Sequence, residues 1–340
     1  MNRLISVVIP NYNGTSTIEK CLEAAFSSRY DNFEVIVVDD CSTDNSAEII
    51  KRFPCKLIHL DKHSGASKAR NTGAYNSIGE ILFFIDADCI LQKDTLKAVN
   101  KAFKEVSPPH PPLGKGGQGG VVIGGTYTRT PYDNNFFSTF QSIFINYSET
   151  KNKEPDYIAA HAMVIDSRVF MEGGGFPEDF LPIIEDVEFS HRLRRSGYKL
   201  VMNPEILVQH IFNFTLLKSL RNAFRKSKYW TVYSLKNKDL FNDSGTASLE
   251  LKTNVASFFL SMILLLLFFL TGSLIYLIFI VILEAINIRI INRKFIKSFL
   301  DAKGLIFTFA STIYYIMVYP VAVGAGSIAG MVDYLLKYKK

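Results

Sequence analysis

The sequence has few cysteines, and their spacing indicates neither a disulfide framework nor a zinc site. The four cysteines among the 340 residues are Cys21, Cys41, Cys55 and Cys89. They form no CxxC pair and have no histidine at zinc-finger spacing, which is typical of reduced thiols in the cytosol. The N-terminus also lacks a secretory signal, because the apolar stretch 4–9 is short and is ended by Pro10. We therefore expect the first part of the chain to lie in the cytosol.

Charged side chains are absent from two long stretches near the C-terminus. Residues 255–283 and 304–332 each contain 29 residues without a charge. A helix of that length is about 43 Å long, whereas the hydrocarbon core of a bilayer is about 30 Å thick. Buried helices of a soluble protein are the alternative. We predict a transmembrane region over residues 255–332, followed by a basic tail at residues 333–340.

The connector between the two stretches leaves two topologies open. If each stretch crosses once, residues 284–303, with five Lys or Arg, lie outside the cell, against the positive-inside rule. In the other arrangement the first stretch breaks near residues 271–273 and returns as a hairpin to about residue 290. That arrangement keeps the connector in the cytosol but gives short spans. The sequence slightly favours two spans, with the connector as an amphipathic segment at the membrane interface.

The net charge of +6 is modest, and much of the positive charge lies just before the first charge-free stretch. Residues 218–238 contain seven Lys or Arg. Four of these fall on one helical face: Lys218, Arg221, Arg225 and Lys228. This pattern predicts a basic amphipathic juxtamembrane segment at residues 213–254, lying on an anionic membrane. A solvated helix packed on the soluble domain is the alternative. No nucleic-acid-binding motif is present, so nucleic acid is not an expected partner.

Apolar runs alternate with helical patterns over the first half of the chain. The predicted strands are 4–10, 33–39, 56–60, 80–86, 121–128, 158–165 and one ending at residue 210; the predicted helices include 16–28, 45–53, 66–75 and 94–106. This alternation predicts a doubly wound, largely parallel sheet. Residues 107–120 are rich in Pro and Gly, and their GxGxxG spacing has no strand before it and no helix after it. We expect that stretch to be a surface insertion without a catalytic role.

Polar clusters follow four of the predicted strands. They are residues 10–14 (PNYNG), 39–44 (DDCSTD), 63–73 (HSGASKARNTG) and 86–88 (DAD). Ligands bind at the carboxyl ends of the strands in such a sheet, so four clusters on one rim indicate a binding site. Asp86 and Asp88 repel each other unless a cation or a shared proton intervenes. Oxygen ligands suit Mg²⁺ or Mn²⁺, which takes its remaining ligands from water and substrate phosphates.

The other clusters suit a nucleotide with a diphosphate. Asp39 or Asp40 can accept hydrogen bonds from a base or a ribose. Lys68 or Arg70 can offset phosphate charge or contact the base. A nucleotide-diphosphate substrate is therefore indicated.

Taken in order, these motifs resemble the family 2 glycosyltransferases, enzymes with the GT-A fold. The matching pieces are SVVIPNYNG, VIVVDDCSTDNS, GASKARNTG, FIDAD and GGFPEDFLPIIEDVEFSHRLRRSGYKL, and they cover about residues 4–210. The resemblance implies a GT-A-type doubly wound mixed sheet over residues 1–212, with a Rossmann-like nucleotide-binding half and an acceptor half. C-terminal transmembrane helices would follow, as in many members of the family.

The resemblance also implies roles for individual residues. Pro10, Tyr12 and Asp39 match positions that line the nucleotide pocket, and Lys68 and Arg70 fall in the segment that closes over the base and phosphates. The metal candidates are Asp88 as principal ligand, Asp86 on the ribose or metal side, and His210, for which a structural histidine is the alternative.

Asp186, in the pair with Glu185, matches the general base. Its alternative is a structural role, since acidic residues at the start of a helix and basic ones at its end suit the helix dipole. His161 lies where the acceptor side is expected but has no partner at motif spacing.

The resemblance implies an inverting, metal-dependent glycosyltransferase that uses Mg²⁺ or Mn²⁺. It would move a sugar from a nucleotide-diphosphate-sugar to a lipid-linked or polysaccharide acceptor in cell-surface glycan synthesis. We expect an integral membrane protein with a cytosolic catalytic domain, and the oligomeric state is not predicted. The alternatives are a polyprenyl-phosphate sugar synthase, a catalytically silent membrane-anchored nucleotide-sugar-binding protein, and a metal-dependent nucleotidyltransferase or diphosphatase.

Overall fold

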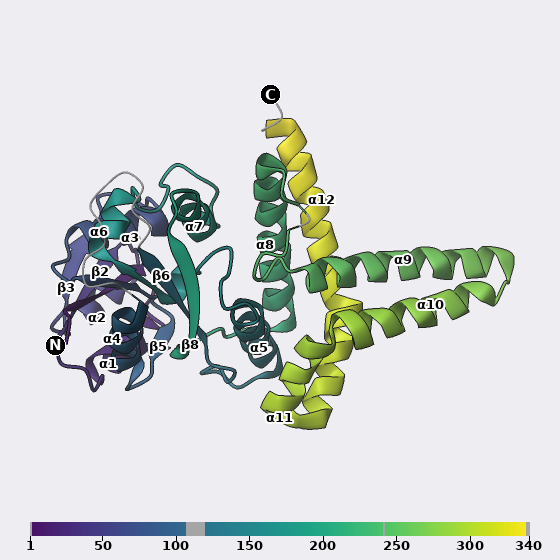
Figure 1. Ribbon diagram of the computed structural model, residues 1–340, viewed down its shortest axis with the longest axis horizontal. Helices are drawn as coiled ribbons and strands as arrows, with labels where there is room; N and C mark the ends of the chain where they lie inside the picture. Colours follow the sequence, from purple (N-terminus) through teal and green to yellow (C-terminus); the bar gives the residue numbers. More distant parts are fainter. Residues whose placement is uncertain (1, 107–119, 241, 338–340) are drawn as a thin grey trace. The chain divides into compact units, whose positions relative to one another are not determined.

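The chain folds into two compact units in the computed structural model (Figure 1). Unit 1 comprises Met1–Asn134 and Glu149–Asn213, and unit 2 comprises Asn135–Ser148 and Phe214–Lys340. The structure describes residues 2–106, 120–240 and 242–337, and it describes only the backbone at positions 290 and 291. The predicted insertion therefore lies, except for Gly120, outside the described residues, as does the end of the basic tail.

Unit 1 is built on one mixed sheet. Among the described residues the strand order is β3-β2-β1-β4-β7-β6-β8-β5. The pairs among β1, β2, β3 and β4 are parallel, as is β6 with β8, whereas β7 and β5 pair antiparallel with their neighbours. The elements are β1 Ile5–Asn11, α1 Ile18–Phe26, β2 Phe33–Asp39, α2 Ser46–Ile50, β3 Lys56–His59, α3 Ala66–Tyr75, β4 Ile81–Phe84, β5 Cys89–Leu91, α4 Thr95–Val106, β6 Val121–Tyr127, η1 Ala160–Ala162, β7 Met163–Asp166, α6 Ser167–Glu172, α7 Glu185–Arg195 and β8 Lys199–His210. The predicted doubly wound mixed sheet is confirmed.

The sheet is held by apolar side chains on both faces, as expected for strands covered by helices. α3 packs on β1 and β2, and α4 packs on β8. Beside α7, the rings of Phe84, Phe170, Phe176 and Phe189 pack together with centroids 5.0 to 5.5 Å apart. This aromatic cluster fixes α7 against the sheet, and α7 carries the acidic pair predicted from the sequence.

Two strand predictions differ from the structure. β4 ends at Phe84, so Asp86 and Asp88 lie in a turn and not on an extended strand. The turn is closed by the Cys89 amide, which donates to the Asp86 carbonyl at 3.0 Å before β5 pairs antiparallel with β8. The predicted strand at 158–165 is also shorter, because residues Ala160–Ala162 form a 3₁₀ turn and β7 begins at Met163.

Unit 2 is helical in its described residues. Its elements are α5 Phe136–Thr150, α8 Leu216–Asn237, α9 Leu249–Thr271, α10 Ile275–Ile286, the π-helical turn Asn287–Ile291, α11 Arg293–Ile313, the π-helical turn Tyr314–Val318 and α12 Tyr319–Lys337. The last two residues of α5, from Glu149 on, belong to unit 1. Aromatic rings from α5, α11 and α12 pack together within unit 2, including Phe140 against Phe299 at 5.5 Å.

The first charge-free stretch is a helical hairpin and not one continuous helix. α9 ends at Thr271, and the next residue, Gly272, has φ +70°, a left-handed conformation that costs glycine little. α10 then returns beside α9. At the base of the hairpin, the hydroxyls of Ser257 and Ser261 donate to Glu284 Oε1 at 3.0 and 2.8 Å. The expectation that this stretch forms a single helix is therefore wrong, whereas the number of membrane spans stays a prediction.

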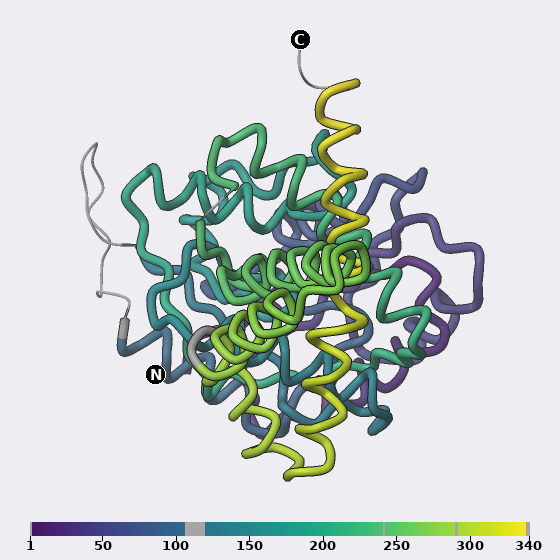
Figure 2. The backbone as a smooth tube through the Cα atoms, turned by 90° about the vertical axis from the view of Figure 1, so that its right-hand side faces the viewer, coloured from purple at the N-terminus to yellow at the C-terminus, as the bar shows by residue number. Residues whose placement is uncertain are grey.

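The predicted basic helix is α8, and its partner is α12. Gly326 and Gly330 let the two helices approach closely, since a Cβ at either would lie within 2.4 Å of a backbone oxygen of α8. Lys228 Nζ also pairs with Asp333 Oδ2 at 2.7 Å. The hairpin projects crosswise to α12 (Figures 1 and 2). The basic helix therefore packs on another helix of its own unit.

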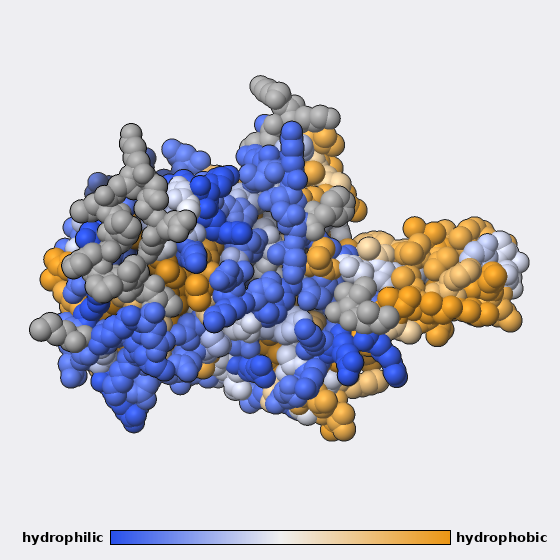
Figure 3. Space-filling model, viewed as in Figure 1, coloured by the Kyte–Doolittle hydropathy of each residue, from blue (hydrophilic) through white to orange (hydrophobic). Residues whose placement is uncertain are grey.

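Apolar side chains cover the hairpin on the face shown in Figure 3. Large exposed ones include Leu266, Phe269, Leu270 and Val281. Two helical runs among the described residues, Leu249–Thr271 and Arg293–Lys337, are long and apolar enough to cross a membrane by length and composition. Both runs belong to unit 2, so the candidate membrane spans of the described residues all lie in that unit.

Candidate functional site

The ends of β1 and β2 are joined by buried polar side chains. Asn11 lies at the end of β1, directly after Pro10, and its side-chain amide donates to Asp39 Oδ1 at 2.8 Å. Asp39 Oδ2 accepts from the Ser42 amide at 3.2 Å, and the His59 ring lies 3.4 Å from the same oxygen. Asp39 is therefore held in one orientation at the rim of the sheet. This is the rim at which the sequence predicted a ligand site.

Asp40 shapes the loop that leads into α3. Its Oδ1 accepts from the Ser64 amide at 2.7 Å, and its Oδ2 accepts from the Gly65 amide at 2.8 Å and lies 2.9 Å from His63 Nδ1. The His63 ring in turn stacks on the half-exposed Tyr12, with ring centroids 4.0 Å apart. Because both Asp40 oxygens are already used by the loop, Tyr12 offers a ligand the more accessible surface.

Arg70 connects three parts of the site. It lies on α3 and is 4% exposed. Its Nη2 donates to Asp86 Oδ1, and its Nη1 donates to Glu185 Oε1, both at 2.6 Å. Lys68, two residues earlier, lies on the surface and pairs with Glu178 at 3.1 Å. Arg70 is thus a buried clamp between the Asp-x-Asp turn and the start of α7, whereas Lys68 is available to solvent.

The two aspartates of the turn have opposite electrostatic behaviour. Burial alone would raise the pKa of Asp86, but Arg70, and more weakly His161, outweigh burial and lower it. Burial and the negative charge of Asp86 instead raise the pKa of Asp88 to about 7. A cation beside Asp88 would offset both effects. The charged form of Asp86 is therefore already stabilised by Arg70, whereas the charged form of Asp88 requires a further cation.

The residues around Asp88 fit a hard divalent metal. Donor atoms of Asp88, Cys89 and His210 lie within 4.8 Å of one another, the one such group found among the described residues. His210 Nε2 is 3.3 Å from Asp88 Oδ1. Burial raises the pKa of the Cys89 thiol well above its usual range. Sulfur is also a poor ligand for the hard ions Mg²⁺ and Mn²⁺, which prefer oxygen donors. One carboxylate and one imidazole remain, which suit Mn²⁺ or Mg²⁺ with open positions. Asp86 lies outside this group, with Oδ1 bound to Arg70.

Asp186 lies in the first turn of α7 and faces η1. Its Oδ2 accepts from the Ala160 amide at 3.1 Å, and its Oδ1 accepts from the Val187 amide at 2.9 Å. A helix N-terminus favours the carboxylate, yet burial and the neighbouring Glu185 raise the pKa of Asp186 to about 6. The residue before this pair, Ile184, has φ +80°, which is strained for a β-branched side chain. The helix dipole alone therefore does not account for Asp186.

The pairing of His161 with Glu149 was not predicted from the sequence. His161, adjacent to Ala160, has its Nε2 3.3 Å from Glu149 Oε1, and the Thr126 hydroxyl donates to Glu149 Oε2 at 2.7 Å. The Tyr127 ring stacks on His161 with centroids 4.0 Å apart. Glu149 precedes His161 by 12 residues, on a different element, so no local motif signals the pair.

A mixed sheet whose strand ends gather an Asp-x-Asp turn, a buried arginine and an acidic helix start defines a GT-A-type fold. Residues 6–166, a little under half of the chain, match the family described as Glycosyl transferase family 2. The match runs from the second residue of β1 to the end of β7. It leaves out the site residues of α7 and its approach, together with His210 at the end of β8. The resemblance inferred from the motifs is confirmed.

Individual proteins are similar over parts of the chain. Glycosyltransferase GlyG of Streptococcus pneumoniae is 32% identical over 40% of this chain and 44% of its own length. Poly(ribitol-phosphate) beta-N-acetylglucosaminyltransferase TarS of Staphylococcus aureus is 36% identical over 27% of this chain and 17% of its own. The matched region thus spans less than half of either relative.

One solved structure has a similar fold over the whole chain. It is the mannosyltransferase PcManGT of Pyrobaculum calidifontis, in complex with GDP-Man and Mn²⁺, with a TM-score of 0.58. The alignment covers 100% of this chain and 89% of that one, at 16% identity. At that identity the likeness concerns the fold.

Proposed function

We propose that this protein is a membrane-anchored, metal-dependent inverting glycosyltransferase. It moves a sugar from a nucleotide-diphosphate-sugar to a membrane-associated acceptor. The observation that carries the proposal is that Asp186, whose pKa is raised to about 6, and the Asp88–His210 pair occur in one unit, with the Arg70 clamp between their segments. A base with a pKa near neutrality and a metal site are the two groups this reaction needs.

The donor occupies the rim formed by the ends of β1 and β2 and the start of α3. Tyr12, stacked on His63 and half exposed, lies against the base, and Asp39 accepts a hydrogen bond from it. Pro10 shapes the same wall, and Asp40 holds the loop that closes it. Lys68 lies near the diphosphate, while Arg70 positions Asp86 for the ribose.

Asp88 and His210 are the residues that hold the metal, Mg²⁺ or Mn²⁺. When bound, the metal acts as a Lewis acid that stabilises the negative charge of the leaving diphosphate. PcManGT, which has a similar fold, was solved with Mn²⁺ and GDP-Man, and this supports the same cofactor class here. Asp86 acts on the donor side through its ion pair with Arg70.

Asp186 removes the proton from the acceptor hydroxyl. The hydroxyl oxygen attacks C1 of the sugar from the face opposite the diphosphate, so one C–O bond forms as the other breaks and the configuration at C1 inverts. The electron pair of the broken bond leaves with the nucleoside diphosphate. The backbone amides of Ala160 and Val187 orient Asp186 for this step.

The acceptor belongs to a cell-surface glycan or to its lipid-linked precursor. TarS, a relative, is named for transfer to poly(ribitol-phosphate), and the hairpin of α9 and α10 supports work at a membrane. A hairpin also keeps residues 284–303 on the cytosolic side with the catalytic unit. Transfer to polyprenyl phosphate itself is the alternative acceptor, and recovery of the sugar on a phosphate would identify it. A silent nucleotide-sugar-binding protein would have no use for a base such as Asp186.

The proposal is tested by thermal stabilisation of the purified protein with a panel of nucleotide-sugars, each without metal, with Mg²⁺ and with Mn²⁺. We expect one donor to raise the melting temperature only with the metal, and Asp88→Asn to abolish the increase. The matched control is Asp94→Asn, which changes an exposed aspartate outside the site. If no donor stabilises the protein with either metal, the proposal is wrong. Release of nucleoside monophosphate in place of nucleoside diphosphate would instead identify a diphosphatase or nucleotidyltransferase.

A further inference from the structure

Asn71 of α3 is buried and uses its side-chain amide in three hydrogen bonds within unit 1. It is 2% exposed. Its Nδ2 donates to the Phe176 carbonyl at 2.8 Å and to Glu178 Oε1 at 3.0 Å, and its Oδ1 accepts from the Phe176 amide at 2.9 Å. The two bonds to Phe176 satisfy both backbone groups of one residue, as the backbone of a neighbouring strand does. Asn71 therefore fixes the backbone of a segment that lies 105 residues later and leads into α7.

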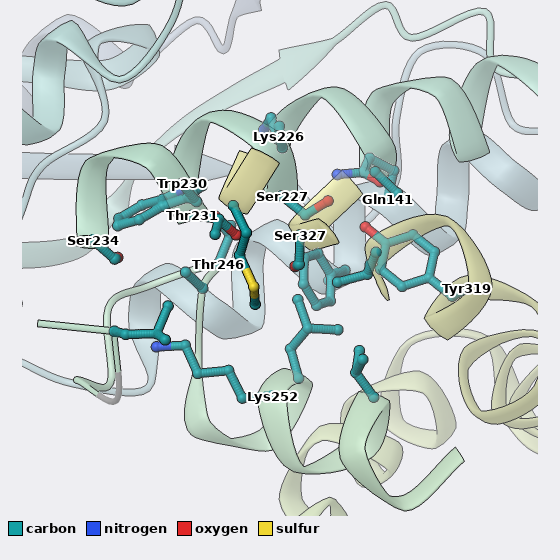
Figure 4. Close-up of a pocket in the computed structure, with 18 residues that line it drawn as sticks. Gln141, Lys226, Ser227, Trp230, Thr231, Ser234, Thr246, Lys252, Tyr319 and Ser327 are labelled. Carbon is teal, nitrogen blue, oxygen red and sulfur yellow. The ribbon is translucent and has the colours of Figure 1, made fainter. Parts of the chain in front are cut away.

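A second buried amide shows that burial alone does not bring such partners. Gln141 of α5 is 1% exposed and lines a cavity within unit 2 (Figure 4). Its Oε1 has no hydrogen-bond partner among the described residues. The side-chain oxygen of Asn71 is bonded, and a buried polar side chain whose bonds are made holds its surroundings in one arrangement. Asn71 thus gives Phe176 a fixed position.

The glycine turn before Phe176 is also held by α7. Arg192 Nη1 donates to the Gly173 carbonyl at 2.5 Å, and its Nη2 donates to the Gly175 carbonyl at 2.6 Å. Gly175 has φ +65°, and a Cβ at this position would lie 2.7 Å from Asn71 Oδ1. The close approach of the turn to Asn71 therefore requires glycine here. The turn is bonded to α3 through Asn71 and to α7 through Arg192.

The ring of Phe176 extends this connection to the site. Arg70 Cζ lies over the ring, 5.7 Å from its centroid, and the Phe189 ring of α7 packs against it with centroids 5.0 Å apart. The Arg70 guanidinium in turn donates to Glu185 Oε1 at 2.6 Å. Phe176 therefore has its backbone bonded to Asn71 and its ring in contact with the side chain that holds the start of α7.

We propose that Asn71 is a positioning residue for Asp186. It acts through Phe176, whose backbone and ring fix the chain that leads into the first turn of α7. This inference rests on the proposed function, because it assigns to Asn71 the placement of the base in that reaction. A misplacement of about 1 Å can cost about 10²-fold in rate, so a residue that acts only through the backbone can have a large effect on turnover.

Hydrogen exchange tests the placement without any substrate. The Ala160 amide donates to Asp186 Oδ2, so its exchange rate reports whether that carboxylate stays in place. In the full-length protein in detergent, Asn71→Ala should speed exchange of the Phe176 and Ala160 amides by roughly tenfold or more. The matched control is Asn76→Ala, which removes an exposed amide at the end of the same helix and should leave both rates unchanged.

Turnover is measured on the same variants as release of nucleoside diphosphate, with Mn²⁺ and the nucleotide-sugar that stabilises the wild type in the panel above. Asn71→Ala should lower kcat by roughly 10- to 100-fold and change the KM for the donor by less than about threefold. In the Asp186→Asn background the same change should cause no further loss, because residues that act as one unit are not additive. Gln141→Met, which removes a buried amide from unit 2, should leave kcat unchanged.

A milder variant is used if Asn71→Ala does not fold. Asn71→Asp keeps an acceptor for the Phe176 amide and loses the donor to the Phe176 carbonyl. Glu178→Gln in the same chain removes the negative charge that would otherwise face the new carboxylate. Exchange at Ala160 and kcat should change in the same directions as for Asn71→Ala, by smaller factors.

Three results would overturn the inference. They are unchanged exchange at Ala160 in a folded variant of Asn71, an equal fold-loss of kcat with and without Asp186, and a loss confined to KM. The exchange measurement contains no donor, so it is independent of catalysis. If exchange at Ala160 rises while the wild type turns over no nucleotide-sugar, the placement of Asp186 by Asn71 stands and the proposed function fails. If the wild type is active and exchange is unchanged, the positioning role alone fails.

Discussion

Asp186 of unit 1 and Glu284 of unit 2 are both carboxylates that are largely withdrawn from solvent, and their surroundings differ. Glu284 accepts hydrogen bonds from the side chains of Ser257, Ser261 and Asn287, all within the hairpin and its base. Among the described residues, Asp186 accepts hydrogen bonds from two backbone amides, and Glu185 lies beside it in the first turn of α7. One carboxylate is surrounded by donors, and the other is paired with a like charge.

This difference separates a structural acid from a reactive one. Side-chain donors that converge on a carboxylate stabilise its charge and tie two helices together. Burial and a neighbouring like charge destabilise the charged form of a carboxylate and raise its pKa toward neutrality. Replacing each acid by a neutral residue should therefore have opposite effects on stability and on activity.

Asp186→Asn should give the largest effect on activity. Loss of a general base lowers turnover by about 10²- to 10⁴-fold. The same change should not lower the melting temperature at pH 7 or above, because it removes a carboxylate that the fold disfavours. Turnover of the nucleotide-sugar and thermal unfolding are measured on the same preparation. Undiminished turnover would remove Asp186 from the mechanism.

The pH dependence of Asp186 sharpens this prediction. Its pKa is raised from 3.8 to about 6, so the folded state holds the proton more tightly than the unfolded state. Wild-type stability attributable to this group is complete below pH 3.8 and falls as the pH rises to about 6. The Asn variant should therefore gain relative stability across that window and keep it above. Wild-type activity should fall as the pH drops below about 6, when Asp186 is protonated.

Arg70→Met should give the largest loss of stability. It leaves Asp86 and Glu185 without their shared cation, and breaking a buried pair in this way costs about 3–5 kcal/mol. The matched control is Lys68→Met, which breaks an exposed pair worth about 0–1 kcal/mol. Chemical denaturation of unit 1 measures both. A double variant with Asp86→Asn should recover part of the loss, whereas strict additivity would show that Arg70 and Asp86 do not interact.

The local sequence pattern was sufficient to predict helices and strands whose bounds depend on their own residues. The helix predicted at 66–75 is Ala66–Tyr75, and the strand predicted at 33–39 is Phe33–Asp39. Both have turn residues at their ends and a clear periodicity. The polar rim was also predictable, because parallel strands present their carboxyl ends on one edge.

Long-range contacts decided the parts that the sequence left open. The apolar run before Asp86 predicts a strand that continues to Asp86. The strand ends earlier, in a turn that leads to β5, and β5 pairs with β8, which lies more than 100 residues later in the chain. A charge-free stretch of 29 residues is compatible with one helix or two, and the contact of Glu284 with Ser257 and Ser261 favours the hairpin. The pairing of His161 with Glu149 could not be predicted either, because the two residues lie on different elements.

Glu284→Leu should lower stability and leave turnover unchanged, the opposite of what we expect for Asp186→Asn. It leaves the hydroxyls of Ser257 and Ser261 without their acceptor in the apolar hairpin, which costs about 1–3 kcal/mol. We expect a lower melting temperature in detergent and unchanged turnover per folded molecule. Asp301→Leu, at an exposed position of α11, is the control for loss of an acid from unit 2. A loss of turnover without a loss of stability would show that Glu284 is not a structural acid.

Thr126→Val should have the smallest effect and tests whether Glu149 belongs with the structural acids or the reactive ones. The Thr126 hydroxyl donates to Glu149 at 2.7 Å, and its removal costs about 1 kcal/mol of stability. If Glu149 only holds His161 in the fold, turnover per folded molecule should not change, as for Glu284→Leu. Thr128→Val, which removes an exposed hydroxyl two residues later, is the control and should change stability by less than about 0.5 kcal/mol. A shift in the pH profile of turnover with Thr126→Val would instead place the Glu149–His161 pair with Asp186, because a purely structural pair does not alter the titration of the base.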